Sequence, residues 1–308
     1  MNILITGTTG FIGSHAKHYL QDQGNRIIEV NRMRLNGHYT FDDVFAGKCR
    51  AEVWLHLAAK SKDIQKKDVY SEYVQANVEL TRQVFEAFIK DDTANTFIFI
   101  SSVKAAAASV PHVLAEGDEL EADGPYGNSK RMAEQHLLSI PLPEHKKLVI
   151  VRPAMVYGYN KESNLYALYK FVKRGLPYPF AAFSNARTMV SIDNLLFVLS
   201  AIINRPDFKA GIYNIADDDA ISTNQLIIWM AEALNKKPSL LKIPRSLIQM
   251  AGNIGDALHL PINTPKLKKL TDDYIVSNQK LTKQLGRPLP FKAEPALKAL
   301  FKRFTVDK

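Results

Sequence analysis

MNILITGTTGFIG, residues 1–13, is the stretch that decides the fold. Three apolar residues from Ile3 predict a strand, three glycines punctuate the turn that follows, and helical periodicity begins at Phe11. Glycines at such a turn let the backbone approach a diphosphate, whose charge the N–H groups of the helix start favour. The stretch therefore predicts dinucleotide binding in preference to a tight turn without a ligand. The expected cofactor contacts here are Gly7, Thr9, Gly10, Phe11, Ile12 and Gly13.

Strands and helices alternate through the first half of the chain. We predict strands over Arg26–Val30, Val53–Leu57, Thr96–Ile100, Leu148–Val151 and Ile212–Ile215, and helices over Phe11–Leu20, Tyr70–Lys90, Tyr126–Leu138 and Ile192–Ile203. This alternation predicts an α/β fold with a Rossmann-like, doubly wound parallel sheet. Beyond Tyr157 it loosens, and prolines break the remainder into short helices. We expect a dinucleotide-binding domain over 1–159 and a smaller, mostly helical substrate domain over 160–308, with roughly 187–216 returning to the first.

Composition limits the class of protein. The 308 residues are 46% hydrophobic, and no apolar run reaches the roughly 18 residues that a membrane span needs. Met1 leads directly into a strand, and Cys49 is the single cysteine, so we expect a cytoplasmic protein without disulfides, a signal peptide or a metal site. The net charge of +9 fits a solvated basic surface, an anionic substrate or peripheral contact with anionic lipid. Nucleic acid is disfavoured, because the lysines are scattered and no aromatic residues interleave the densest cluster, Lys266, Lys268 and Lys269.

The end of the second strand bears on the cofactor. Rossmann units that bind NAD place an Asp or Glu there for the ribose 2′-hydroxyl, whereas a nearby Arg accommodates a 2′-phosphate. This chain has Asn31, Arg32 and Arg34. We therefore expect NADP(H), with NAD(H) as the alternative if both arginines are surface residues. After the third strand, the small Ala58 and Ala59 let the chain pass close to the cofactor.

Three polar residues downstream fit a proton-transfer site. Ser101 and Ser102 stand at a strand end, and Tyr126 and Lys130 lie one helical turn apart on the same face. A free tyrosine has a pKa of about 10, and a nearby ammonium and an oxidised nicotinamide both favour its phenolate. Tyr126 would donate a proton to a substrate oxygen during reduction and accept it during oxidation. A capping tyrosine and a chance lysine are the structural alternative.

The sequence resembles the extended short-chain dehydrogenases/reductases of the NAD-dependent epimerase/dehydratase family over essentially its full length. The matching stretches are Thr6–Gly13, Leu57–Ala59, Asn77, Ser101–Ser102, Pro125–Lys130, Arg152–Pro153, Val156–Gly158 and Arg187–Asp193. The resemblance implies a catalytic triad of Ser102, Tyr126 and Lys130, with Ser101 as the alternative serine. It also implies cofactor contacts at Leu57, Ala58, Ala59, Tyr126, Lys130 and Pro153, and substrate contacts at Ser102, Lys104, Tyr157, Asn164 and Arg187. A nucleotide-diphosphate sugar, with UDP as the expected nucleotide, is the implied partner, and a homodimer is usual in the family.

Departures from the family pattern narrow the activity. A 4,6-dehydratase is expected to carry an Asp-Glu pair directly after the catalytic hydroxyl, where this chain has Val103 and Lys104. The sequence is more similar to the 4-keto-sugar-nucleotide reductases that make UDP-N-acetyl-6-deoxyhexosamines. A UDP-hexose 4-epimerase, which uses the same three residues but retains its cofactor, is the alternative enzyme. A non-catalytic NADP(H) sensor is the alternative of another class, and a Ser-Tyr-Lys triad argues against it because a sensor does not need one.

Overall fold

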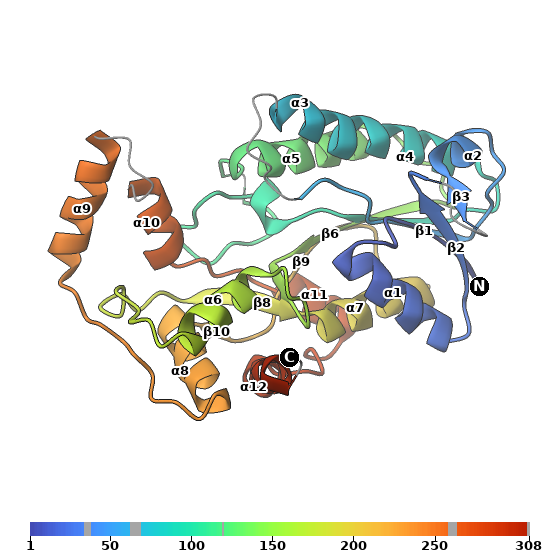
Figure 1. Ribbon diagram of the computed structural model, residues 1–308. Helices are drawn as coiled ribbons and strands as arrows, with labels where there is room; N and C mark the ends of the chain where they lie inside the picture. Colours follow the sequence, from blue (N-terminus) through green and yellow to red (C-terminus); the bar gives the residue numbers. More distant parts are fainter. Residues whose placement is uncertain (34–37, 62–68, 119, 258–263, 307–308) are drawn as a thin grey trace.

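The computed structural model describes residues 1–33, 38–61, 69–118, 120–257 and 264–306. Within these residues the largest element is a seven-stranded sheet in the order β3-β2-β1-β4-β5-β6-β9, and its neighbouring strands are parallel (Figure 1). The strands are β1 (Asn2–Thr6), β2 (Arg26–Asn31), β3 (Tyr39–Thr40), β4 (Val53–His56), β5 (Thr96–Ile100), β6 (Lys147–Pro153) and β9 (Gly211–Ile215).

Helices cover both faces of this sheet because both faces of its strands are apolar. On β1, Ile3 and Ile5 are buried toward one face and Leu4 toward the other. The first face packs on α1 (Phe11–Asp22) and α7 (Ile192–Asn204), the second on α4 (Leu80–Lys90) and α5 (Gly124–Ser139). Shorter helices complete this part of the chain: α2 (Phe41–Phe45), α3 (Val69–Val74) and α11 (Gln279–Leu285).

The strand order changes direction between β1 and β4, which are hydrogen-bonded neighbours. Connections from β1 run outward to β2 and β3, and those from β4 run the other way to β5 and β6. In open α/β sheets, ligands bind at such a switch point, outside the carboxyl ends of the strands. The glycine turn after β1 and the serine pair after β5 both lie at that edge.

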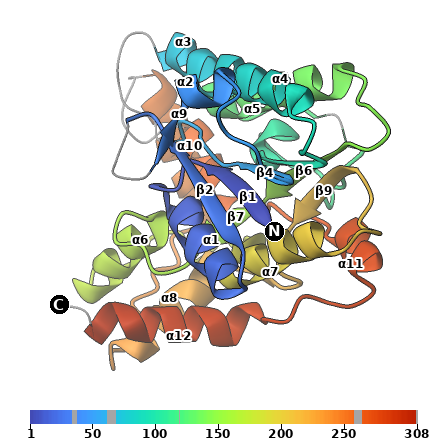
Figure 2. The same cartoon turned by 90° about the vertical axis from the view of Figure 1, so that its right-hand side faces the viewer.

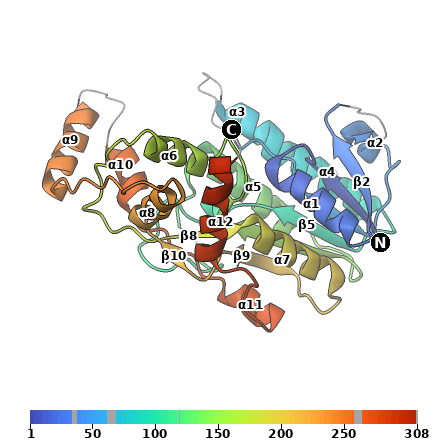
Figure 3. The same cartoon turned by 60° about the horizontal axis from the view of Figure 1, so that its bottom comes forward.

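The rest of the chain forms a smaller, mainly helical unit with a core of its own. A three-stranded sheet, β10-β8-β7, packs with α6, α8 and α12. Figure 2 shows α12 along the lower side of the molecule, and Figures 1 and 3 show α9 and α10 standing away from the large sheet. The elements are β7 (Met155–Tyr157), β8 (Arg187–Ser191), β10 (Ala220–Ile221), α6 (Asn164–Lys173), α8 (Thr223–Ala233), α9 (Arg245–Ala257), α10 (Thr264–Thr271) and α12 (Ala293–Val306).

The predicted fold class is confirmed: the sheet is parallel and doubly wound, and a smaller helical part follows. The helix expected over Tyr70–Lys90 contains a π-helical turn, η1 (Gln75–Glu79), between α3 and α4. The segment 39–50, whose pattern is weak, forms β3 and α2. The domain boundary after residue 159 stays a prediction. Among the residues that the structure describes, no helix has both the length and the apolar character to cross a bilayer.

Candidate active site

The glycine turn has a geometry that side chains would disrupt. Gly7 has φ +76°, in the left-handed region, and a Cβ there would lie 2.8 Å from the Ala58 nitrogen. A Cβ on Gly13 would lie 2.1 Å from the Gly7 carbonyl oxygen. Gly10 precedes the first helical residue and has no such clash, since the nearest atom would be 3.4 Å away. Two glycines therefore shape the turn, while the bare Gly10 leaves the N-terminus of α1 open.

Asn31 stands at the end of β2 in place of an acid. Its amide Nδ2 lies 3.1 Å from the Thr8 hydroxyl and 3.2 Å from Nδ1 of His38, and the side chain is buried. The acid of this strand, Glu29, lies two residues earlier and forms a 2.6 Å ion pair with Lys17. Burial opposes ionisation of Glu29, but hydrogen bonds from Lys17 and Thr8 outweigh it, so the pKa of the carboxyl is below its ordinary value. Glu29 is therefore ionised, and its carboxylate is already engaged by Lys17.

Arg32 follows Asn31 and is exposed. Arg34 lies outside the described residues. On the other side of β1, Leu57, Ala58 and Ala59 follow β4 and are partly exposed beside the glycine turn.

A histidine that the sequence reading did not single out connects the two strands at the switch point. The Thr6 hydroxyl accepts hydrogen bonds of 3.1 Å from the N–H groups of Leu57 and Ala58, so it donates its proton to Nδ1 of His56 at 2.8 Å. Nε2 of His56 then donates to the Thr81 hydroxyl at 3.0 Å. Burial, with the charge of Lys130 adding to it, lowers the pKa of His56 to about 3. The one available signal was a histidine inside an apolar strand.

The π-helical turn brings Asn77 next to α5, the helix of Tyr126 and Lys130. Thr81 donates to the Asn77 carbonyl at 2.8 Å, and the Asn77 side chain binds the backbone of Lys60 through its Oδ1 and Nδ2. Nδ2 also donates to Ser129 at 2.9 Å, and Ser129 donates to the Tyr126 carbonyl at 2.8 Å. π-Helical turns are frequent at functional sites. Here the turn ties the strand ends to the helix of Tyr126 and Lys130.

Ser102 and Tyr126 are brought together by a close approach of two backbones. The Ser102 side chain lies close enough to Tyr126 to lower the pKa of its phenol, and its hydroxyl accepts a 3.2 Å hydrogen bond from the Lys104 nitrogen. Gly127 permits this close approach, because a Cβ there would lie 2.4 Å from the Lys104 carbonyl oxygen in the turn after Ser102. Burial raises the pKa of Tyr126 to about 12, and the nearby Ser102 opposes that shift. Ser101 is buried, and its hydroxyl has no hydrogen-bond partner among the described residues, so the geometry favours Ser102 of the pair.

Lys130 is 2% exposed and lies against the end of β5. Its Nζ donates to the Ile100 carbonyl at 2.7 Å and stands 4.6 Å from the centre of the Phe99 ring. Burial lowers the pKa of Lys130 to about 7, while the charge of Glu134 opposes that shift. Glu134 is itself bound by Arg152 of β6 through several short hydrogen bonds. The helix of Tyr126 is thus fixed to two strands of the sheet.

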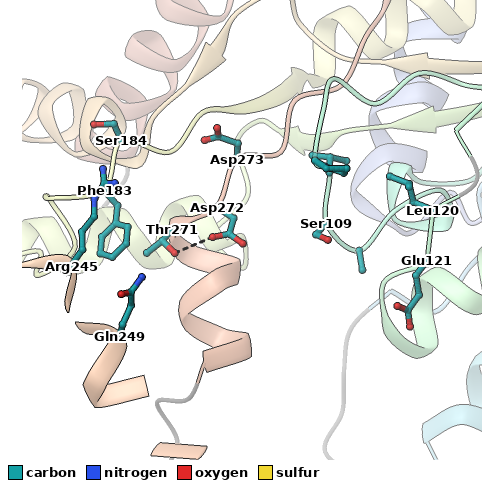
Figure 4. Close-up of a pocket in the computed structure, with 13 residues that line it drawn as sticks. Ser109, Leu120, Glu121, Phe183, Ser184, Arg245, Gln249, Thr271, Asp272 and Asp273 are labelled. Carbon is teal, nitrogen blue, oxygen red and sulfur yellow. Dashed lines mark hydrogen bonds between the residues drawn. The ribbon is translucent and has the colours of Figure 1, made fainter. Parts of the chain in front are cut away.

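Arg187, a predicted substrate contact, begins β8 and donates through Nε and Nη2 to the Asp272 carbonyl, at 3.1 and 3.0 Å. Burial lowers the pKa of the Arg187 guanidinium, and Asp272 opposes that shift. Asp272 lines a cavity of about 780 Å³. Figure 4 shows Asp272 and Asp273 between two walls, with Arg245 and Gln249 on one side and Glu121 on the other.

The remaining predicted residues have distinct environments. The Tyr157 hydroxyl donates to Asp217 at 2.8 Å, and burial raises the pKa of that hydroxyl. Lys104 forms a 3.1 Å ion pair with Asp123. Asn164 is exposed at the first position of α6, and Pro153 is buried at the end of β6. The residues that line the 780 Å³ cavity include neither Arg187 nor the predicted triad; Arg187 reaches the cavity wall through its hydrogen bonds to the Asp272 carbonyl.

Comparison with known proteins identifies the family. The model of the NAD dependent epimerase/dehydratase family matches residues 3–216. The chain belongs to this family. As a member it is an NAD(P)-dependent enzyme, and its similar relatives include sugar-nucleotide epimerases and reductases. These relatives confirm the family resemblance seen in the sequence.

Similarity extends over most of the chain. A UDP-glucose 4-epimerase of Vibrio cholerae is 28% identical, over 82% of this chain and 82% of its own length. An N-acetyl-alpha-D-glucosaminyl-diphospho-ditrans,octacis-undecaprenol 4-epimerase of Escherichia coli O157:H7 is 26% identical over 83% and 80%. A UDP-2-acetamido-2,6-beta-L-arabino-hexul-4-ose reductase of Pseudomonas aeruginosa is 24% identical over 78% and 59%.

Solved structures share the fold of this family member. MoeE5 in complex with UDP-glucuronic acid and NAD has a TM-score of 0.77 at 19% identity, covering 99% of both chains. Human epimerase family protein SDR39U1 with NADPH has a TM-score of 0.77 at 18% identity, covering 100% of both. Both nicotinamide cofactors therefore occur within the fold.

Proposed function

We propose that the protein transfers hydride at carbon 4 of a hexose held through a diphosphate, and that Tyr126 exchanges the proton of the sugar oxygen. The observation that supports this most is the close approach of the Tyr126 helix to the turn after Ser102, which Gly127 permits, with the buried Lys130 bound at the same ligand-binding edge of the sheet. A tyrosine with a raised pKa is fully protonated at neutral pH and is ready to donate.

The glycine turn suits the diphosphate of a dinucleotide. Positions 7 and 13 have no room for a side chain, and the first N–H groups of α1 face the exposed Thr9 and Gly10. A bound nicotinamide would supply or remove the hydride. Asn31 and Arg32 at the end of β2 support NADP(H) over NAD(H) in this proposal, since the one acid of that strand, Glu29, is already held by Lys17.

Ser102, Tyr126 and Lys130 have separate roles in the proposed proton transfer. Ser102 shares the substrate oxygen with Tyr126 and orients it. Tyr126 donates its proton as that oxygen gains charge during reduction, and the charge of Lys130 stabilises the phenolate that remains. Because burial brings the pKa of Lys130 to about 7, its charge is sensitive to pH near neutrality.

The substrate proposal rests on a diphosphate that the substrates of two relatives share. One relative's name specifies UDP-glucose, and another's an N-acetylglucosaminyl diphosphate linked to undecaprenol. A hexose on a diphosphate is shared by both. Arg187, next to the cavity, supplies the guanidinium that such an anion favours.

Within this chemistry we propose a reductase that acts on a 4-keto-6-deoxy-hexosamine carried by UDP. Val103 and Lys104 stand where a dehydratase would need two acids, and a reductase must exchange its cofactor, as an NADP(H) user does. A UDP-hexose 4-epimerase is the second candidate, because one relative is named a UDP-glucose 4-epimerase and another a 4-epimerase of an undecaprenol-linked N-acetylglucosaminyl diphosphate.

Absorbance of NADPH separates the candidates. With a UDP-linked 4-keto-6-deoxy-N-acetylhexosamine, the reductase consumes one NADPH for each sugar reduced. With UDP-glucose or UDP-N-acetylglucosamine, an epimerase forms the C4 epimer without net loss of cofactor. NADPH binding without turnover of any of these sugars would refute both proposals and favour a sensor.

A further inference from the structure

Two helices of the smaller unit expose apolar side chains to solvent. Leu247 and Met250, one turn apart on α9, are 50% and 55% exposed, and Leu270 on α10 is 47% exposed. The hairpin has a small core, because Ile248 of α9 and Leu267 of α10 are buried. The exposed side chains are therefore those that the helix pair does not use for its own packing.

The same stretch carries much of the positive charge of the protein. Residues 242–271 contain five basic residues and one acidic residue, a net charge of +4 out of +9 for the whole chain. The basic residues are Lys242, Arg245, Lys266, Lys268 and Lys269. Lys242 and Lys268 are exposed. Apolar side chains flanked by cations fit an interface between water and anionic lipid headgroups.

We propose that α9 and α10 dock on an anionic membrane surface. Leu247 and Met250 would enter the headgroup region, and Lys242 and Lys268 would pair with lipid phosphates. The helices stand away from the large sheet, where a flat surface can reach them (Figures 1 and 3). Charge favours an anionic membrane over a second copy of the chain as the partner of this surface. A second copy, with the same net charge of +9, would bring cations against cations.

Docking would place the cavity next to the lipid. Arg245 and Gln249 line the 780 Å³ cavity from α9, the helix that exposes Leu247 and Met250 (Figure 4). A membrane-bound protein would thus hold this cavity near the headgroups. This proposal concerns the surface and does not depend on the chemistry of Tyr126.

Vesicle flotation tests the proposal. The full chain is mixed with vesicles of phosphatidylcholine containing about 30% phosphatidylglycerol, and with vesicles of phosphatidylcholine alone. We expect partitioning onto the anionic vesicles that falls in about 0.5 M salt. The double variant L247S/M250S should lower the partition coefficient about tenfold or more. Lys242→Gln and Lys268→Gln should each lower it about fivefold, the effect of one basic residue near an anionic surface.

Matched controls come from elsewhere on the surface. The double variant L138S/L176S removes two apolar side chains that are 52% and 44% exposed, and Lys302→Gln removes an exposed charge. These variants should partition as the wild type does. Circular dichroism verifies that each variant is folded.

Three results would overturn the proposal. They are an absence of wild-type partitioning onto anionic vesicles, equal partitioning onto neutral vesicles, and a folded L247S/M250S variant that partitions as the wild type does. Sedimentation velocity tests whether a second copy of the chain binds this surface instead. A wild-type dimer that L247S/M250S converts to a monomer would assign this face to a second copy of the chain.

Discussion

Asn77 donates a 2.9 Å hydrogen bond to the Ser129 hydroxyl, and that hydroxyl donates a hydrogen bond to the carbonyl of Tyr126. Asn77 lies in the π-helical turn, while Ser129 lies in the helix that presents the predicted proton donor. The position of Tyr126 thus depends on a side chain that does not face the substrate.

Replacing Ser129 with Ala should lower kcat about threefold to tenfold, because the helix loses a contact that fixes Tyr126. KM should change little, since Ser129 is fully buried and away from the cavity. Steady-state kinetics measures both. Ser139→Ala is the matched control, because Ser139 is exposed at the end of the same helix and its hydroxyl bonds to the His136 carbonyl of that helix. A folded Ser129→Ala variant with the kcat of the wild type would contradict this role.

The glycine turn predicts different outcomes for two conservative changes. Gly13→Ala places a Cβ 2.1 Å from the Gly7 carbonyl, so both the melting temperature and NADPH affinity should fall. Gly10→Ala has 3.4 Å of room, so the fold should persist while the affinity falls about tenfold. Calorimetric titration and thermal melting measure the two effects. Equal NADPH affinity in Gly10→Ala and wild type would contradict the prediction that the diphosphate binds at this turn.

Arg32→Asp tests the cofactor preference. An arginine beside the strand end suits a 2′-phosphate, whereas a carboxylate repels it and accepts a hydrogen bond from a free 2′-hydroxyl. The ratio of kcat/KM for NADPH to that for NADH should fall about tenfold or more. Arg26→Asp is the control, since Arg26 is exposed at the opposite end of β2. An unchanged ratio would make Arg32 an ordinary surface residue.

The low pKa of His56 predicts how the free energy of unfolding depends on pH. The unfolded chain binds a proton on this histidine near pH 6.5, whereas the folded protein does so only near pH 3. Protonation therefore favours unfolding, and stability falls as the pH drops below 6.5. Between pH 6.5 and 5 the loss from His56 is about 2 kcal/mol. In His56→Gln this part of the loss should vanish, as urea unfolding at several pH values would measure. The same pH slope in both proteins would contradict the low pKa.

Much of the fold follows from local pattern. The strands from Arg26, Val53 and Thr96 are short, apolar runs between helical segments, and they form where the pattern predicts them. The segment 39–50 is different, because the two-residue β3 is defined by pairing with β2 rather than by its own periodicity. The π-helical turn at Asn77 also leaves little trace in a helical pattern.

The candidate site also combines features that local spacing predicts with features that depend on long-range contacts. Spacing along one helix places Tyr126 and Lys130 on one face, and Gly127 brings Ser102 to them through a contact with Lys104 that only the folded chain contains. His56 joins Thr6 and Thr81 across 50 and 25 residues. Tyr157 is expected near the substrate, yet its hydroxyl binds Asp217, a partner 60 residues away. Long-range partners of this kind have no signature in a single sequence.

Tyr126→Phe, assayed with isotopically labelled cofactor, tests the central claim most directly. The cofactor is NADPH deuterated at both positions of nicotinamide carbon 4, and the substrate is the UDP-linked 4-keto-6-deoxy-N-acetylhexosamine. Mass spectrometry of the wild-type product should show one deuterium at carbon 4 of the sugar. Tyr126→Phe should still bind NADPH but form this product at least about a hundredfold more slowly, because the proton donor is gone. A product without deuterium, or a phenylalanine variant as fast as the wild type, would contradict the account.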